Sequence, residues 1–428
     1  MFACTDSAVF NSGNSVMKSR SHLLSALLVL TFATSVPALH AQTPAPAPAA
    51  AETVRAIVGT PLQEAQAMIQ AKQYAEAFAK LDSIDALPDR TPFEIYSIDR
   101  TRGAAAAASG NAELTGTVFA RILDSGRLPA DEQLKLIEGV TGSFYNAKNY
   151  PKTIVWAQRY QKQGGASASV ATMLVQSQYL INDHAGVVAS LKASMQADDQ
   201  AGRPTPEIQL QMLADSARKT SDDALYVATL ERLLQTYPKP AYWTDLINRI
   251  PRQAGFSDRY TLDVLRLQRA TGTLANALDY ADLAEFALQA NLPAEALAVL
   301  EEGYAANLLG TGPQSARHTK LRTQARSQSA ADQKILTSSE AAAQKASAGT
   351  ALVNVGTNYL GQKDYPRAIA LLDQGIAKGG LKHPDEATLH LGIALQQSGN
   401  KARAATVLKT LQARDGSAEL ARLWTYVK

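Results

Sequence analysis

The sequence is poor in the residues that carry most catalytic and metal chemistry. Only one of its 428 residues is a cysteine, Cys4, so the rest of the chain offers no thiolate nucleophile, no disulfide and no cysteine metal ligand. Four histidines follow residue 41, and they form neither an HExxH motif nor another spacing typical of a metal site. The sequence also lacks G-x-S-x-G and P-loop motifs. We therefore expect a protein that is not an enzyme and that holds no metal and no cofactor.

Aromatic residues and charge are also scarce. Aromatic residues make up 6% of the sequence and charged residues 19%, and the formal net charge is only +3. Because nucleic-acid-binding proteins carry dense positive patches, this balance gives no support to a nucleic-acid partner. Alanine is abundant and alternating β-branched residues are rare, which favours helix throughout the chain.

The N-terminal region has the pattern of a secretory signal. Lys18 and Arg20 precede an apolar run of 14 residues, 23–36, which is shorter than the roughly 20 residues that a transmembrane helix needs. We interpret residues 1–41 as a signal peptide cleaved after Ala41, with Ala38 as the alternative and Met17 as an alternative start to Met1. The mature chain then has no transmembrane segment, and we expect it in the periplasm. Residues 42–59 are rich in proline and alanine and predict a stiff linker.

A repeat begins at residue 60. A small or polar residue follows an apolar pair at intervals of 35 to 38 residues, apart from one gap of 72 across an atypical unit. Self-similarity at this period is typical of helical repeats. The positions are Ala65, Gly103, Thr141, Gln176, Ala214, Arg249, Ala284, a site near Lys320, Gly356 and Gly392.

Three segments depart from this repeat. Pro251 predicts a kink or an early end in the helix that contains Arg249. The apolar stripe thins between residues 314 and 345, which predicts either one long, poorly buried helix or a degenerate repeat. Residues 417–428 form one amphipathic helix without a partner, and we expect it to cap the exposed face of the last repeat.

The clearest unit, residues 351–380, resembles the tetratricopeptide repeat. Two short amphipathic helices flank a polar turn, and the family pattern falls on Leu352, Gly356, Tyr359, Ala368 and Leu372. The resemblance implies an all-α, right-handed α-solenoid with about ten helix-turn-helix units and a C-terminal capping helix. The units divide into N-terminal repeats at 60–310, an atypical basic segment at 311–348, and C-terminal repeats with the cap at 349–428.

First helices of that family line a concave groove that holds peptides, so polar residues there are the first candidate site. Asn354 and Asn358 are one helical turn apart, His390 lies 36 residues after Asn354, and Gln397 follows His390 by seven. Asparagine suits a peptide because its amide both donates and accepts hydrogen bonds. A second candidate is a basic surface for an anionic membrane or an acidic partner, formed by Arg317, Lys320, Arg322 and Arg326.

We therefore expect a non-catalytic periplasmic scaffold that binds a protein or peptide partner in its groove. Similarity to envelope proteins with this repeat suggests work in cell-envelope assembly. Two alternatives are a ligand-binding protein or enzyme with a pocket inside the superhelix, and peripheral membrane association through residues 317–326.

Export is directly testable. N-terminal sequencing of the protein recovered from the periplasm should begin near Gln42, because the apolar run is removed with the signal. A soluble exported product that still carries residues 23–36 would contradict this prediction.

Overall fold

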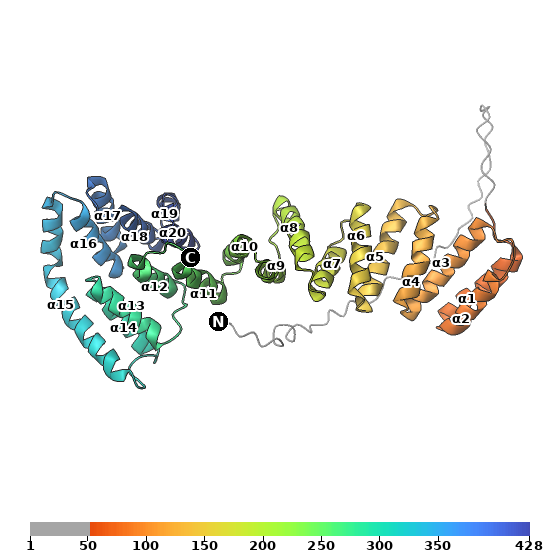
Figure 1. Ribbon diagram of the computed structural model, residues 1–428, viewed down its shortest axis with the longest axis horizontal. Coiled ribbons are helices and arrows are strands. Elements are labelled where there is room, and N and C mark those ends of the chain that lie inside the picture. Colours follow the sequence, from red (N-terminus) through yellow and green to blue (C-terminus); the bar gives the residue numbers. More distant parts are fainter. Residues whose placement is uncertain (1–51) are drawn as a thin grey trace, which may run out of the picture. The chain divides into compact units, whose positions relative to one another are not determined.

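Helices account for nearly all regular structure in the computed structural model, which describes residues 52–428 (Figure 1). The predicted signal peptide and residues 42–51 of the predicted linker lie outside the described residues. The first helix begins at Ala56, inside the range predicted as linker. In residues 52–428, no helix is both long enough and apolar enough to cross a membrane.

The described residues contain twenty α-helices and two short 3-10 helices. Their bounds are α1 Ala56–Gln70, α2 Tyr74–Asp85, α3 Pro92–Ser109, α4 Ala112–Asp124, α5 Ala130–Asn146, α6 Tyr150–Lys162, α7 Ala168–Leu180, α8 His184–Gln200, α9 Glu207–Lys219, α10 Asp223–Thr236, α11 Pro240–Arg249, η1 Ile250–Arg252, η2 Asp258–Tyr260, α12 Thr261–Ala270, α13 Ala277–Gln289, α14 Pro293–Ala305, α15 Ser315–Lys345, α16 Thr350–Gly361, α17 Tyr365–Lys378, α18 Pro384–Gln397, α19 Lys401–Leu408 and α20 Ser417–Trp424.

Consecutive helices pack as hairpins, and each hairpin packs on the next. Nine of the ten positions that marked the sequence repeat fall in the first helix of their unit, and the tenth, near Lys320, lies in the single long helix α15. The prediction of an all-α array of helix-turn-helix repeats is confirmed. Its right-handed twist stays a prediction.

The small residues of the repeat allow the two helices of a hairpin to approach closely. A Cβ atom added to Gly356 would lie 2.9 Å from Leu372 Cγ, and one added to Gly392 would overlap Leu408. Ala368 and Ala404, at the matching positions of the second helices, are fully buried. Close approach of this kind is why the repeat requires small side chains.

The two irregular units are as the sequence indicated. α11 ends at Arg249, and Pro251 lies in the 3-10 turn that follows. The second irregular unit is one long helix, α15 (Ser315–Lys345), and not a degenerate helix-turn-helix repeat. This helix packs on α13, α14 and α16.

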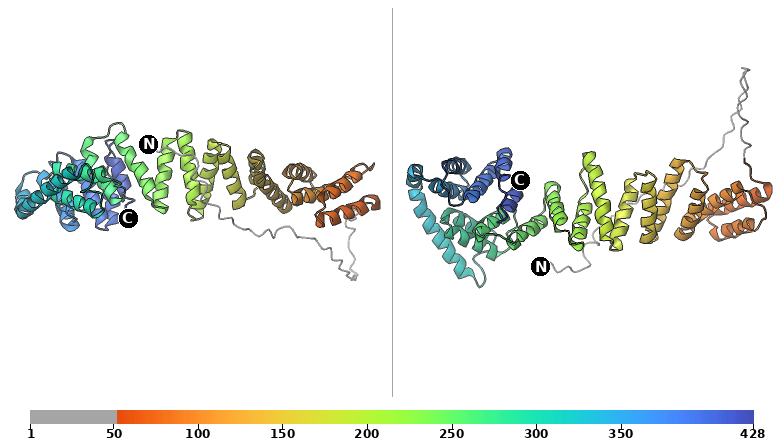
Figure 2. Two further views of the ribbon diagram at one scale, coloured as in Figure 1. Left: turned by 90° about the horizontal axis from the view of Figure 1, so that it is seen from below. Right: turned by 45° about the horizontal axis from the view of Figure 1, so that its top comes forward.

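The C-terminal helix does more than cap the last repeat. α20 contacts α18 and α19 as expected, but it also packs on α12, far earlier in the chain (Figures 1 and 2). The loop before α20 also contacts the segment that precedes α12. Ser257 N donates a hydrogen bond to Asp415 O at 3.0 Å, and Arg259 forms an ion pair with the Asp415 carboxylate. The chain from α11 to α20 therefore returns on itself, so the prediction of a simple end cap was incomplete.

Substitution at the hairpin contact gives a test of this packing. Ala368→Leu should lower the free energy of unfolding by about 1–3 kcal/mol, because the larger side chain has no room against α16. Ala370 is exposed on the same helix, so Ala370→Leu is the matched control and should change stability by less than about 0.5 kcal/mol. Urea unfolding measures both, and equal stability of the two variants would show that this face of α17 is not the packed one.

Candidate functional site

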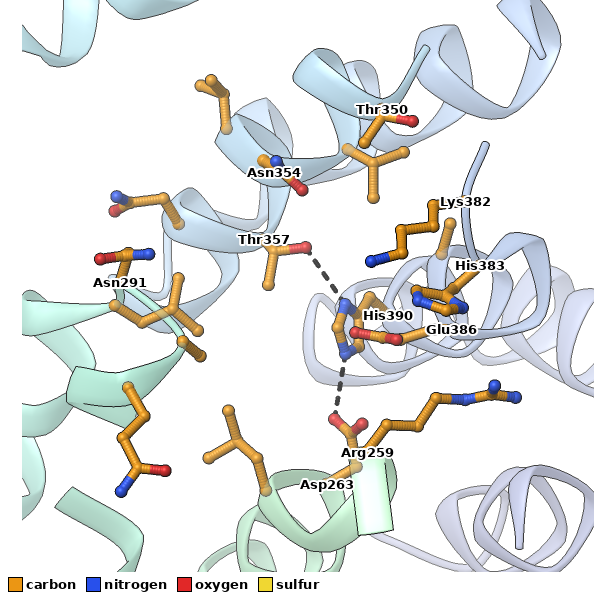
Figure 3. A pocket seen from close by; sticks show the side chains of 18 of the residues that line it. Arg259, Asp263, Asn291, Thr350, Asn354, Thr357, Lys382, His383, Glu386 and His390 are labelled. Atoms are coloured by element: carbon orange, nitrogen blue, oxygen red, sulfur yellow. Dashed lines mark hydrogen bonds and ion pairs between the residues drawn. The ribbon is translucent and has the colours of Figure 1, made fainter. Parts of the chain in front are cut away.

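The return of the chain encloses a pocket of about 700 Å³. Its walls come from α12, the end of α13, α15, α16 and the start of α18 (Figure 3). This volume falls within the range of ordinary ligand sites, roughly 300–1,000 Å³. The pocket is therefore the first candidate for a binding site in residues 52–428.

A buried ion cluster lies beside this pocket. The Arg266 guanidinium from α12 binds Glu295 of α14 through two parallel hydrogen bonds, Nε to Oε1 at 2.9 Å and Nη2 to Oε2 at 2.6 Å. Its Nη1 donates to Asp263 Oδ1 at 2.9 Å. Arg266 is 7% exposed, and both carboxylates are more deeply buried. Charges this deep in a protein persist only when they are paired and hydrogen-bonded.

His390 extends the cluster to two more helices. Its Nε2 lies 3.1 Å from Asp263 Oδ1 and 3.2 Å from Arg266 Nη1, and its Nδ1 lies 3.1 Å from the Thr357 hydroxyl (Figure 3). Since His390 lies on α18 and Thr357 on α16, one imidazole joins three helices around the pocket. Asp263, Arg266, Glu295 and His390 together form the ion cluster.

The electrostatics of the cluster favour the charged forms. Burial raises the pKa of the Asp263 carboxyl, but the charge and hydrogen bonds of His390 and Arg266 outweigh it, so the pKa ends below its ordinary value. Glu295 behaves in the same way, because Arg266 outweighs its burial and lowers its pKa. Burial lowers the pKa of Arg266, and the two carboxylates outweigh it and raise the pKa above its usual range. Asp263, Glu295 and Arg266 are thus held ionised inside the fold.

Thr357, His390 and Asp263 follow the order of a nucleophile, base and carboxylate triad. However, Thr357 lies inside α16, where backbone N–H groups are engaged by helix carbonyls. They are not free to stabilise an oxyanion, which is the usual need of acyl transfer. The arrangement is better suited to fixing helices than to catalysis.

The mouth of the pocket carries the side chains that are free to contact a partner. Asn354, Lys382 and His383 are exposed, and Glu386 is half-buried. Figure 3 shows these four side chains around the same opening. Within the described part of the chain, neither Lys382 nor Glu386 forms an ion pair closer than 4.0 Å. The mouth therefore offers a partner one amide from Asn354, one positive charge from Lys382 and one negative charge from Glu386.

The structure brings together three of the four residues predicted for the groove. Asn354, Asn358 and His390 line the same pocket. Gln397 lines a second pocket instead, which shares Arg266 with the first. Asn358 is buried, donates to Asp332 Oδ2 at 2.8 Å and accepts from Gln362 at 2.7 Å. Of the two asparagines, Asn354 is the one exposed to a partner.

The predicted basic surface is largely neutralised by neighbouring helices. Arg317 pairs with Glu285 and Asp282 of α13, while Arg322 and Arg326 both pair with Glu301 of α14. Lys320 is exposed and forms no ion pair with the residues that the structure describes. These contacts give the three arginines a role in fixing α15.

Sequence reasoning missed Asp263, Arg266 and Glu295. A signal was present in α12, where Asp263 and Arg266 stand among the buried Leu262, Val264 and Leu267. Charged residues three apart on an apolar helix face indicate a buried pair. Nothing in the sequence pointed to Glu295 as their partner.

Comparison with known proteins gives only distant similarities. No known family pattern and no curated protein matches the sequence. Among solved structures, the chain is similar to a complex of Naa15/Naa10 bound to HypK-THB (15% identity, 82% of this chain, 63% of that chain, TM-score 0.28), to yeast Tom70 (10%, 82%, 84%, 0.23) and to the pentatricopeptide repeat protein PPR10 from maize (13%, 86%, 61%, 0.28). The chain spans less than two thirds of the Naa15/Naa10 and PPR10 chains it matches. Similarities at this level do not identify a function.

The buried cluster gives a prediction on stability. Arg266→Met should cost about 3–5 kcal/mol of unfolding free energy, because it leaves two buried carboxylates without their cation. Arg403→Met is the control, since the Arg403–Asp373 pair is largely exposed, and it should cost less than about 1 kcal/mol. Chemical denaturation measures both, and similar losses would mean that the cluster is not a structural centre.

The same cluster predicts acid sensitivity. The folded-state pKa values of Asp263 and Glu295 lie below their ordinary values of 3.8 and 4.5. Their contribution to stability is therefore complete above about pH 4.5 and is lost as the pH falls through the lowered values. The variant Asp263→Asn, Glu295→Gln should show a shallower fall in unfolding free energy below pH 4.5. A slope equal to that of the original chain would refute this assignment.

Proposed function

We propose that this protein is a non-catalytic scaffold that binds a protein partner through the pocket beside α16 and α18. The observation that carries the proposal is the mouth of the pocket, where Asn354, Lys382 and Glu386 are exposed or half-buried and not committed to ion pairs. The ion cluster holds the surrounding helices in place before a partner arrives. Such preorganisation reduces the entropy lost on binding.

An extended peptide segment fits the chemistry of this mouth. The Asn354 amide can donate to and accept from a peptide backbone. Lys382 and Glu386 supply one charge of each sign, and Phe286, 37% exposed, adds an aromatic surface at the rim. The proposed partner therefore carries an extended segment of mixed charge with an apolar side chain.

We place this scaffold in the periplasm, in an assembly of the bacterial cell envelope. The support for export is the basic and apolar pattern of residues 17–41. The envelope role rests on the resemblance to exported repeat proteins, and folds of this kind host many functions.

A small-molecule ligand in the same pocket is a second candidate. It is favoured by the polar groups of Asp263, Thr357 and His390, which converge on the inner wall. These groups already satisfy one another, whereas the free groups lie at the mouth. The protein partner is therefore the better-supported reading.

Site-specific crosslinking tests the proposal. A photo-reactive residue at position 354 should capture one protein from periplasmic extract, because the side chain faces the pocket mouth. The same residue at position 402, exposed on α19, is the control and should not capture it. Equal capture at the two positions, or none at position 354, would move the binding site away from this pocket.

The captured partner then allows a quantitative test by calorimetry. Asn354→Ala should weaken binding by about 0.5–1.5 kcal/mol, the contribution of one hydrogen bond. Asn358 is kept, because its replacement would leave Asp332 without its donor. Arg326→Ala should leave the affinity unchanged, and a loss there with none at Asn354 would favour the basic segment.

A further inference from the structure

The side chains that line the first pocket, of about 700 Å³, carry more negative than positive charge. The acidic ones are Asp258, Asp263, Asp332 and Glu386, and the basic ones are Arg259, Arg266 and Lys382. Arg266 already binds Asp263, together with Glu295 from outside this lining. Arg259 forms its ion pair with Asp415, which does not line the pocket either. Existing pairs therefore use two of the three cations.

Three carboxylates of the pocket remain without a cation. Asp258, Asp332 and Glu386 form no ion pair with any group in residues 52–428, and the same holds for the Lys382 ammonium. Three carboxylates against one ammonium leave an excess of two negative charges among the unpaired groups. A surface of one sign attracts a partner of the opposite sign and disfavours one of its own. The partner of this pocket is therefore expected to bring positive charge.

Asp332 is held in position to bind that charge. It is half-buried on α15, and the Asn358 amide of α16 donates to its Oδ2 at 2.8 Å. Gln362 in turn donates to the Asn358 carbonyl at 2.7 Å, which orients the amide. Within the described residues, Asp332 Oδ1 accepts no hydrogen bond. A cationic group on a ligand would stabilise this half-buried carboxylate through a charge-assisted hydrogen bond.

Apolar side chains lie beside this carboxylate in the pocket. Leu336 follows Asp332 by one helical turn on α15, so the two residues share a face of the helix. Leu262 and Val353 line the same pocket from α12 and α16. Lysine and arginine bury their methylene stems against apolar surface while the charged end stays in a polar environment. The lining therefore suits a long basic side chain better than a compact cation.

We infer that the protein partner proposed above enters this pocket with a lysine or arginine side chain, whose charged end pairs with Asp332. The inference rests on the proposed function and names the residue type that the partner must carry. Glu386 is half-buried at the mouth and adds to the attraction (Figure 3). The Asn354 amide at the same mouth can bind the backbone of the entering segment.

Two peptides with blocked ends, which differ in one residue, test this inference on the full chain. The probes are Ac-Ala-Leu-Arg-Leu-Ala-NH2 and the same peptide with glutamine in place of arginine. Peptide-observed NMR titration should show at least about tenfold tighter binding of the arginine peptide, because hydrogen bonds between charged groups are the stronger ones. Only the affinity of the arginine peptide should fall as salt is added, because ions screen the attraction.

Substitutions locate the charge that is responsible. Asp332→Asn removes the charge and keeps an oxygen for Asn358, so it should weaken binding of the arginine peptide by about tenfold and leave the glutamine peptide unchanged. Asp385→Asn is the matched control, because Asp385 is half-buried at the start of α18 and does not line the pocket. It should change either affinity by less than about twofold.

Glu386→Gln keeps the test decisive if the Asp332 variant fails to fold. Glu386 makes no hydrogen bond within the described residues, and its replacement should weaken binding of the arginine peptide by about threefold. Unchanged affinity in that variant, equal binding of the two peptides, or unchanged discrimination between them in Asp332→Asn would overturn the inference. Putrescine that binds as tightly as the arginine peptide would also overturn it, because a small amine would then be the ligand.

These outcomes can be told apart from a failure of the proposed function. Capture of a protein at position 354 together with equal binding of both peptides would leave the scaffold in place and remove only the basic side chain from its partner. Selective binding of the arginine peptide through Asp332, without capture of any protein at position 354, would support the basic anchor and contradict the proposed protein partner.

Discussion

The C-terminal half of the structure depends on one buried guanidinium. Arg266 of α12 is held by Glu295 of α14 and Asp263 of its own helix, and it contacts His390 of α18. A guanidinium has five N–H donors in a rigid planar fork, so it can bind one carboxylate through two parallel hydrogen bonds and still donate to other groups, which the single ammonium nitrogen of lysine cannot do. It can therefore join helices that are separated by more than a hundred residues, and both cavities are lined by its side chain.

Much of the repeat could be predicted from the sequence, because hairpin packing is local. Gly356 and Leu372 are 16 residues apart, so one apolar period and one small residue encode their contact. The break at Pro251 was also predictable, since proline removes a backbone donor wherever it stands. Local rules of this kind fix each hairpin and its immediate neighbours.

The closure of the chain was not predictable, because it depends on pairs that no period relates. His390 and Asp263 are 127 residues apart, and Ser257 meets Asp415 through backbone atoms that leave no mark in side-chain patterns. The candidate site was affected in the same way. The spacing of the repeat correctly predicted that Asn354 and His390 lie close together, and both line one pocket. It did not predict that Asn358 is buried against Asp332 or that Gln397 lines another pocket, because both depend on contacts between different units.

The packing of α20 on α12 also indicates the order in which parts of the chain fold: the hairpins first and this long-range contact later. Hairpins of neighbouring helices form from local contacts and can fold as the chain emerges, whereas contacts between distant segments form slowly because a long loop must be closed first. Trp424 belongs to α20, so the wall that it gives to the second pocket forms only after helices α1 to α19 have been synthesised. A chain that stops before residue 417 would retain its hairpins and lose that wall, because it would lack the contacts of α20 with α12 and α18.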